Sequence, residues 1–552
     1  VDSAVVAYLL QQQQQRQQPQ GGEELELLGV HMSNWDYHEE GSSSSSASST
    51  STATGYCWEQ DWKDARSVAT CLKIPIQHLS FQSEYWNDVF EPYIHKISQS
   101  ITPNPDIDCN RYIKFGVLKQ YIKQRYDDVD YCLATGHYAR VWDSSNSICR
   151  SIDTYGDGGG DGSSSRTTTK TMPAYLKEAL EDNELISSGV VDYLLNSSNN
   201  RSIILMSARD RTKDQSYFLC GVPIQSFANV MFPLGDLYKN DQSQNHNQRQ
   251  SIDSDSSNII TVSMSDEYTN RSVRQIAKDA NLPPNVANKR DSVGICFVGK
   301  RKHGEFINEY VTPPPSSFSS TISTTRSSSS STSSTMTDQN EQFELINIED
   351  GTIVGAFDPI KNPSLLYATA GQGAKISGAA QRWFVVESRH PSKPNQLLVC
   401  PGTHHPALYS DCLSIKSNEM NWLAVVGDGG NDGGSGSTRN PPNPPPPPLP
   451  LRLKCRIRHL QPLVDCEIRK NSSSEYGSSG DDDDDDDRYV VQLDVPLRGI
   501  APGQVCAFYV GGRDGDLICL GGGPIHERGP TFWERQQDLL STLHPAGHND
   551  RS

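Results

Sequence analysis

The chain has no apolar run approaching the ~20 residues that a membrane-spanning helix needs, which predicts a protein that does not cross a membrane. Its 13 cysteines are an odd number, and no two of them have Cys-x-x-Cys spacing. This pattern disfavours a zinc ribbon or a secreted disulfide framework and favours a reducing compartment. The chain also lacks an excess of positive charge, with a net charge of −18. Because residues 481–487 alone supply seven aspartates, local rather than net charge has to decide whether nucleic acid binds.

Hydrophobic residues make up only 35% of the 552 residues, less than in an ordinary globular chain. Low-complexity tracts explain the deficit, since their Ser, Asn, Gln, Pro and Asp content cannot build a core. They are residues 11–20, 41–54, 151–170, 240–258, 313–340, 427–450 and 471–487. We interpret them as disordered insertions at loops, and the remainder is long enough for two or three cores.

The first 220 residues alternate between helical and strand patterns. Helices are predicted over residues 4–10, 61–72 and 85–98, and strands over residues 25–32, 74–81 and 131–135. Asp2 and Ser3 stand where the first helix would be capped. Strands separated by helices predict a doubly wound parallel sheet in an α/β fold, with ligands at the carboxyl ends of its strands.

After residue 345 the helical period gives way to short strand patterns. Residues 451–458 alternate strictly, with apolar residues on one face and Arg452, Lys454, Arg456 and Arg458 on the other. The residues around 489–497 and 503–509 continue the strand pattern, and Gly521-Gly522-Gly523 predicts a tight turn. We expect a small antiparallel β-barrel. Its basic face is equally compatible with a solvated surface and with contacts to nucleic-acid phosphates.

Two cysteines lie in segments suited to chemistry. Cys109 lies in a proline-stiffened loop between Asp106, Asp108 and basic residues, and Cys296 lies between glycines ahead of the basic run 300–303, which would favour the thiolate. The remaining cysteines in apolar segments are interpreted as small buried hydrophobes: Cys71, Cys132, Cys220, Cys455, Cys506 and Cys519. No metal site is predicted, because His137, His404 and His405 lack a second ligand at the required spacing.

An ordered series of motifs resembles the tRNA-specific 2-thiouridylases, bacterial and organellar enzymes that thiolate the wobble uridine of tRNA. The motifs are Asn-Pro-Asp-x-x-Cys-Asn (104–110), Ala-Thr-Gly-His-Tyr-Ala-Arg (134–140), Lys-Asp-Gln-Ser-Tyr-Phe-Leu (213–219), Phe-Pro-Leu-Gly (232–235), Asp-Ser-x-Gly-Ile-Cys-Phe (291–297), Ala-Pro-Gly-Gln (501–504) and Cys-Leu-Gly-Gly-Gly (519–523). The resemblance covers nearly everything outside the low-complexity tracts.

The resemblance implies a PP-loop ATP-pyrophosphatase domain with a Rossmann-like parallel sheet, a small central domain and a C-terminal antiparallel β-barrel. On this sequence these correspond to residues 1–225, 226–312 and 345–530, with a disordered linker at 313–344 and a tail at 531–552.

The resemblance also implies the chemistry. ATP, with Mg²⁺, adenylates O2 of the uridine, and a cysteine persulfide loaded by a sulfur-donor protein then delivers sulfur to C2. Cys296 would carry the persulfide, Cys109 would be its disulfide partner, and Asp106 would transfer a proton. The positions that match the family's ATP contacts are Val1, Asp2, Ser3, Met32 and Gly136. The positions that match its tRNA contacts are Asn104, Pro105 and Asp106 at the target base, and Lys213, Asp214, Gln215, Arg456 and Ile457 elsewhere.

The chain departs from the family pattern in two places. Only Val1-Asp2-Ser3 remains of the Ser-Gly-Gly-x-Asp-Ser loop that cradles the ATP phosphates, so we expect a truncated N-terminus that also removes any targeting peptide. In residues 367–375, Gly373 replaces the family's usual arginine, which puts one basic contact in doubt.

Two other functions remain open from the sequence. One is a non-catalytic tRNA-binding protein with a degenerate ATP site, and the other is another PP-loop ATP-dependent ligase. We expect a monomer. We also expect a mitochondrial location, because homopolymeric insertions suggest a eukaryotic gene and the family that the chain resembles works in organelles in eukaryotes; the plastid and the cytoplasm are the alternatives.

Overall fold

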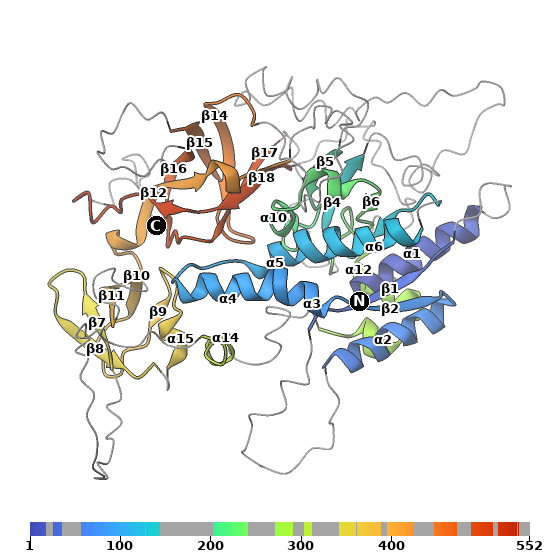
Figure 1. Ribbon diagram of the computed structural model, residues 1–552, viewed down its shortest axis with the longest axis horizontal. Coiled ribbons are helices and arrows are strands. Elements are labelled where there is room, and N and C mark those ends of the chain that lie inside the picture. The colour runs from blue at the N-terminus through green and yellow to red at the C-terminus, as the bar shows by residue number, and fades with distance from the viewer. Residues whose placement is uncertain are drawn as a thin grey trace, which may run out of the picture.

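The computed structural model describes residues 1–17, 26–35, 57–126, 129–143, 203–240, 271–290, 303–311, 342–359, 362–387, 395–423, 446–471, 487–511, 517–537 and 539. Helices and strands mix in the first half, and strands dominate the second (Figure 1). The helical segments of the first half are α1 (Asp2–Gln17), α2 (Cys57–Leu72), α3 (Gln82–Tyr85), η3 (Trp86–Phe90), α4 (Glu91–Ser98), α5 (Pro105–Asp108), η4 (Cys109–Val117), α6 (Leu118–Arg125), α10 (Ser216–Leu219) and η5 (Ile224–Phe227). Those that follow are α12 (Val273–Asp279), α13 (Pro284–Ala287), α14 (His303–Ile307), α15 (Pro363–Leu366), η7 (Pro406–Leu408) and η8 (Ser417–Glu419).

In the described part of the first half, parallel strands occur as two separate pairs, which agrees with the parallel pairing that the sequence predicts. Strand β1 (Gly29–Ser33) pairs in parallel with β2 (Ile76–Ser80), and β3 (Leu133–Ala134) pairs in parallel with β6 (Val230–Met231). Helix α1 packs against α2 and α12, and their apolar faces share one core. This arrangement brings the beginning of α1 to the sheet.

Helix α1 is longer than predicted, because it continues into the glutamine tract as far as Gln17. The exclusion of residues 11–17 from packed structure was therefore wrong. Glutamine is a good helix former, and the Gln11 side chain donates a hydrogen bond to the backbone carbonyl of Leu72 at the end of α2.

Two consecutive helical runs cross the middle of the molecule. Segments α3, η3 and α4 form the first, and α5, η4 and α6 form the second; they contact each other through η3 and η4 (Figure 1). The π-helical segment η4 begins at Cys109. π-helical segments are rare and occur frequently at functional sites.

The described residues of the second half form two sheets. Five strands in the order β8-β7-β11-β10-β9 form the smaller one: β7 (Phe343–Asn347), β8 (Ile353–Phe357), β9 (Gly373–Ala374), β10 (Trp383–Glu387) and β11 (Gln396–Pro401). The larger antiparallel sheet has the order β19-β12-β16-β15-β14-β17-β18-β5-β4, with β13 beside β18. Its strands are β4 (Ala139–Asp143), β5 (Ile203–Ser207), β12 (Tyr409–Lys416), β13 (Asn421–Trp422), β14 (Leu451–Arg456), β15 (Val464–Lys470), β16 (Arg488–Arg498), β17 (Val505–Gly511), β18 (Leu517–Pro524) and β19 (Glu527–Arg528).

The larger sheet joins the two halves of the chain. Ile518 and Cys519 of β18 pair with Met206 and Leu205 of β5, so strands from the predicted first domain continue the C-terminal sheet. One apolar core likewise contains Leu205 together with residues of β17 and β18. The predicted domain boundaries remain predictions, but the two halves of the chain share a sheet and a core.

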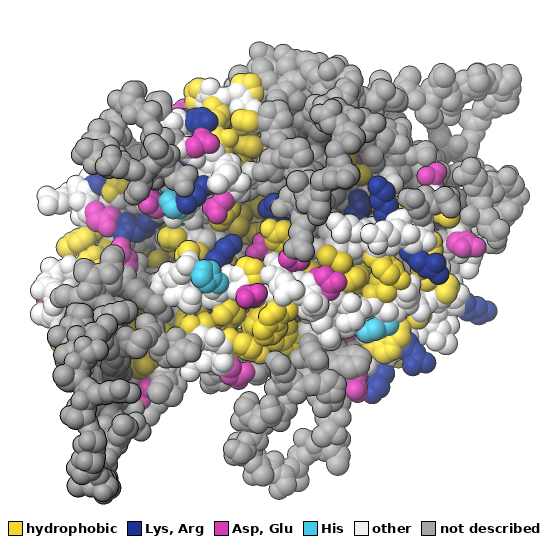
Figure 2. Space-filling model, in the orientation of Figure 1, with side chains coloured by type: hydrophobic (Ala, Val, Ile, Leu, Met, Phe, Trp, Pro, Cys, Tyr) yellow, Lys and Arg dark blue, Asp and Glu magenta, His cyan; other side chains and the backbone are white. Residues whose placement is uncertain are grey.

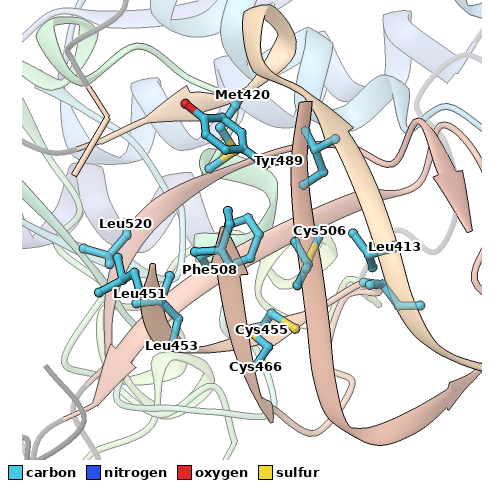
Figure 3. Close-up of a cluster of buried hydrophobic side chains, with 14 of the residues drawn as sticks. Leu413, Met420, Leu451, Leu453, Cys455, Cys466, Tyr489, Cys506, Phe508 and Leu520 are labelled. Atoms are coloured by element: carbon cyan, nitrogen blue, oxygen red, sulfur yellow. The ribbon is translucent and has the colours of Figure 1, made fainter. Parts of the chain in front are cut away.

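The core of the larger sheet contains the apolar face predicted for residues 451–458 (Figure 3). Cys455 and Cys506 lie inside it, as expected for small hydrophobes, and Cys220 and Cys519 are buried in the adjoining core. Cys71 was wrongly assigned to this class, because its thiol is exposed at the end of α2.

The three consecutive glycines do not form the predicted turn. Gly521, Gly522 and Gly523 lie within strand β18, between β17 and β13. A Cβ atom on Gly521 would lie 1.9 Å from the Asn421 carbonyl oxygen, so only glycine lets β13 approach this closely.

Candidate functional site

The start of α1 lies against the loop that follows β3. A Cβ atom on Gly136 would lie 3.0 Å from the backbone nitrogen of Ser3 and 3.1 Å from Cβ of Asp2. The Tyr138 hydroxyl donates a 2.9 Å hydrogen bond to Oδ1 of Asp2, and Lys239 forms an ion pair with the same oxygen. The structure thus brings together three of the predicted ATP-binding residues at the N-terminal end of a helix, where backbone N–H groups favour anions.

The Cys109 segment has a well-defined local structure. The Asn104 side chain accepts a 3.1 Å hydrogen bond from the Asp106 backbone N–H and caps α5, while Pro105 occupies the first turn. The prediction of a loop at Cys109 was wrong, because Cys109 is the first residue of η4, and it is 3% exposed in a core that also contains Ile113.

The connection between β16 and β17 of the larger sheet, which corresponds to the predicted barrel, contacts the loop that precedes this segment. Gly503 has φ +84°, and a Cβ atom there would lie 2.3 Å from Cγ2 of Ile101. The Thr102 backbone N–H donates a 2.9 Å hydrogen bond to the Pro502 carbonyl. The Ala-Pro-Gly-Gln motif is therefore explained by a close approach to residues 101–102, the start of the loop that precedes α5 (called the target-base loop below, after its predicted role).

A hydrogen-bond network extends from Cys109's neighbour Asn110 to the loop after β3. Asn110 Oδ1 accepts a 2.9 Å hydrogen bond from the Lys114 ammonium and lies 3.3 Å from Nε2 of His137. His137 Nδ1 lies 2.7 Å from the Thr135 hydroxyl. Burial lowers the pKa of His137 well below 6.5, so the ring is neutral; its Nε2–H donates to Asn110 and its Nδ1 accepts from Thr135.

Asp106, the residue predicted to transfer a proton, is half-buried. Burial raises its pKa above the ordinary value, although the nearby positive charges of Lys114 and His459 oppose that shift. A carboxyl group with a raised pKa is a more effective general acid or base at neutral pH than an ordinary one.

The Lys213-Asp214-Gln215 segment is tied to both the barrel and the β3 loop. The Gln215 backbone N–H donates to the Tyr138 carbonyl at 2.7 Å, and Tyr138 N–H donates to Oε1 of Gln215 at 2.9 Å. Asp214 Oδ2 accepts from Arg456 at 2.7 Å, and both side chains are almost completely buried. This pair joins β14 to the loop before α10.

Four of the positions predicted to contact tRNA thus lie inside the protein: Pro105, Asp214, Arg456 and Ile457. Arg456 is buried against Asp214, and Ile457 is fully buried in the barrel core. The next two residues, Arg458 and His459, are half-buried, and His459 packs on Phe218 with ring centroids 4.4 Å apart. The alternating pattern includes Arg458 and could have named it as a candidate tRNA contact. No pattern in the sequence indicates that His459 packs on Phe218.

The basic face of residues 451–458 is largely neutralised. Arg452 forms a bidentate ion pair with Asp494, and Lys454 pairs with Asp465 at 2.7 Å. In the view of Figure 2, Lys and Arg side chains likewise lie among Asp and Glu side chains. This face therefore offers less positive charge than its sequence suggests.

The other predicted site residues are less closely grouped. Met32 lies in β1 and packs beside the core of Cys109, whereas Val1 accepts the first backbone hydrogen bond of α1, from Val5 N–H at 2.9 Å. Lys213 is half-buried. Cys296 lies outside the described residues, so its distance from Cys109 stays a prediction.

The departure at Gly373 is open to substitution. A Cβ atom there would meet no atom within 4 Å, whereas the Thr369 hydroxyl lies 3.4 Å from that of Thr102 in the target-base loop. A side chain at position 373 would thus begin in open space. Among the residues that the structure describes, no helix is both long and apolar enough to span a membrane.

Comparison with known proteins agrees with this arrangement. Residues 1–158 and 166–263 match the family described as tRNA methyl transferase HUP domain, and residues 440–525 match the aminomethyltransferase β-barrel domain. The mitochondrial tRNA-specific 2-thiouridylase 1 of Drosophila melanogaster is 28% identical over 96% of this chain and 92% of that protein. The human protein of the same name is 27% identical over 97% of this chain and 90% of its own length.

A bacterial relative has the same extent. The tRNA-specific 2-thiouridylase MnmA of Chlamydia trachomatis serovar D is 28% identical over 95% of this chain and 94% of that protein. The HUP-domain match thus precedes the β-barrel match along the chain. Relatives from bacteria and animals align along nearly the whole chain. The chain belongs to the family of the tRNA-specific 2-thiouridylases.

Proposed function

We propose that this protein thiolates C2 of the wobble uridine in tRNA, using ATP and a cysteine persulfide. The observation that carries the proposal is the loop after β3. Gly136 touches the start of α1, and its neighbour His137 is hydrogen-bonded to Asn110, the residue after Cys109. Two consecutive residues therefore connect the end of a helix suited to phosphate with the segment that carries a candidate catalytic cysteine.

The proposed reaction has two steps. Uridine O2 attacks the α-phosphorus of ATP, pyrophosphate leaves, and the adenylated oxygen becomes part of a good leaving group. The terminal sulfur of a persulfide then attacks C2, and AMP departs with the former O2. When Cys109 attacks the inner sulfur of the Cys296 persulfide, the S–S bond breaks and a Cys109–Cys296 disulfide forms. A dithiol reductant must return both thiols before the next turnover.

Asp106 is assigned the proton transfer at the target base, next to Asn104 and Pro105. Its half-buried position and raised pKa support this role. Lys114 lies close enough to Asp106 to oppose that shift, so it would also stabilise the ionised form of the carboxyl group.

The start of α1 fits the phosphate groups of ATP. The backbone of Gly136 approaches Ser3 so closely that a side chain on Gly136 would occupy the space there, and Ser3 itself is exposed. Asp2 and Ser3 would hold the nucleotide with its Mg²⁺, and Met32 and Gly136 would lie on the adenine side.

Binding of tRNA is proposed to use Lys213 and Gln215, with Asp214, Arg456 and Ile457 acting through the backbone or through the loops they position. The buried Asp214–Arg456 pair supports such an indirect role. We further propose a monomer that receives sulfur from a donor protein, and a mitochondrial location, which the names of the animal relatives support.

The test is thiolation of tRNA by the protein expressed from its complete gene. The protein is incubated with ATP, a sulfide donor and tRNA that has an unmodified wobble uridine, and the digested tRNA is analysed for 2-thiouridine by mass. We expect product from the wild type and from Cys71→Ser, a control at an exposed thiol, and none from Cys109→Ser or Cys296→Ser. Thiolation by the Cys296→Ser variant would remove the persulfide role. If the wild type also makes no 2-thiouridine but still binds tRNA, the protein is a non-catalytic tRNA-binding protein.

A further inference from the structure

Lys239 is a completely buried lysine that the reaction described above does not use. Its side chain is 1% exposed. An ammonium group this deep in the protein is costly unless it is paired, so its partner matters. That partner is Oδ1 of Asp2, the first residue of α1.

The backbone of Lys239 is held from two sides. Its N–H donates a 3.0 Å hydrogen bond to Oδ2 of Asp210, and its carbonyl accepts one of 3.3 Å from Arg274 N–H. The ammonium also lies 5.6 Å from the centroid of the Tyr138 ring, whose hydroxyl donates to the same oxygen of Asp2. Lys239 is therefore fixed in place before any ligand arrives.

The two partners differ in exposure. Whereas Lys239 is buried, the side chain of Asp2 is 33% exposed. One oxygen of the carboxylate is thus held from inside by an ammonium and a phenol, while the exposed part of the group remains at the end of α1. Small displacements of such a group can change its contribution to binding or catalysis strongly.

We propose that Lys239 is a positioning residue for nucleotide binding, which acts by holding the Asp2 carboxylate and thereby the first turn of α1. This inference rests on the proposed function, because it takes ATP as the ligand at this helix. Lys239 itself does not touch the nucleotide. Its effect reaches the ligand through Asp2, and Tyr138 supports it.

The test measures ATP affinity by calorimetry with Mg²⁺ present, and separately the pyrophosphate released when tRNA is added. We expect Lys239→Met to weaken ATP affinity at least tenfold, because methionine fills a similar volume without the charge. Tyr138→Phe should have a smaller effect in the same direction. Lys289→Met serves as the matched control, because its ammonium pairs with Asp61 and Asp64 instead, and it should bind ATP as the wild type does.

A purely structural role is excluded by combining variants. If Lys239 acts through Asp2, adding Lys239→Met to Asp2→Asn should weaken ATP affinity no further, whereas independent effects would multiply. The tRNA affinity of Lys239→Met should stay within twofold of the wild type. Unchanged ATP affinity, or multiplying effects, would overturn the inference even where the wild type thiolates tRNA. If the wild type binds ATP without thiolating tRNA, the proposed function fails while the affinities still decide the role of Lys239. A wild type that does not bind ATP would overturn both.

Discussion

Asp106 and Asp108 lie two residues apart, and both carboxyl groups have pKa values raised by burial. Only Asp106 is assigned to the target base. Because burial favours the neutral form, the ionised form of Asp106 that accepts a proton is reached at a higher pH than for an ordinary carboxyl group. Thiolation should therefore rise with pH through this raised pKa.

The variant Asp106→Asn should lose this acid limb together with most of the activity. Asp108→Asn, which removes a carboxyl group of the same kind, should keep the limb. The measurement is kcat/KM for tRNA from about pH 4.5 to about pH 8, because the pH dependence of kcat/KM reports the pKa values of essential groups in the free enzyme. An unchanged limb in Asp106→Asn would assign the titration to another group.

Gly503 provides a second prediction at the scale of the residue. Alanine at position 503 would combine an unfavourable positive φ with a Cβ contact of 2.3 Å to Ile101. Alanine at Gly351, where φ is +72° and no atom lies within 4 Å of the Cβ position, carries the backbone cost alone. The backbone term is about 1–2 kcal/mol for either variant.

We expect Gly503→Ala to be the more destabilised of the two in thermal unfolding and to lose thiolation, because the clash displaces the target-base loop. Gly351→Ala should keep its activity. Equal melting temperatures and activities would show that Ile101 moves aside without cost.

At the scale of the element, strand β14 carries two arginines in contrasting environments. Arg456 pairs with Asp214 in the interior, whereas Arg452 pairs with Asp494 with 38% of its side chain exposed. Removing one member of a buried pair costs about 3–5 kcal/mol, because the other charge remains unpaired. An exposed pair contributes about 0–1 kcal/mol.

The variant Arg456→Met should therefore lower the midpoint of denaturant unfolding much more than Arg452→Met, although both remove one arginine from the same strand. Circular dichroism in urea measures the difference. Similar midpoints would mean that the three other hydrogen bonds to the Asp214 carboxylate are sufficient to stabilise its buried charge.

How far the sequence predicts these elements depends on what holds them. Periodicity located α2 and β14, and the alternation of helices with strands predicted the parallel pairing of β1 with β2, because these are local patterns. It misjudged the glycines of β18, whose strand conformation depends on the approach of β13, a segment about 100 residues earlier in the chain.

The candidate site shows the same division. The resemblance placed Asp2, Ser3 and Gly136 in one site, and the structure brings them together. It could not show that Arg456 is buried, because the partner Asp214 is 242 positions away. Contacts made at such separations leave no periodic pattern in the sequence.

At the scale of the whole molecule, the chain leaves and re-enters the β15–β16 hairpin at adjacent residues. Lys470 pairs with Tyr489, and Asn471 N–H donates a 2.9 Å hydrogen bond to the Arg488 carbonyl. The hairpin is thus closed without residues 472–486. Replacing them with a short Gly-Ser linker should leave the melting temperature and thiolation unchanged, since a shorter loop costs slightly less entropy to close.

The opposite result is expected when the C-terminal sheet is removed. A fragment of residues 1–341 would lack β18 beside β5 and the β17 side chains that share a core with Leu205. We expect it to be rapidly digested by protease and to unfold without a cooperative transition. A protease-resistant fragment with a sharp transition would show that the first half folds alone.

The pairing of β5 with β18 also has a consequence for synthesis. Ser207 of β5 and Leu517 of β18 are 310 positions apart. At about 5–20 residues per second, a ribosome needs roughly 15–60 s to add the second strand after the first. For that time a nascent chain presents one edge of β5 without its final neighbour, and exposed strand edges favour aggregation. The protein should therefore depend on chaperones that bind emerging chains, more than a protein whose strands pair with near neighbours in sequence.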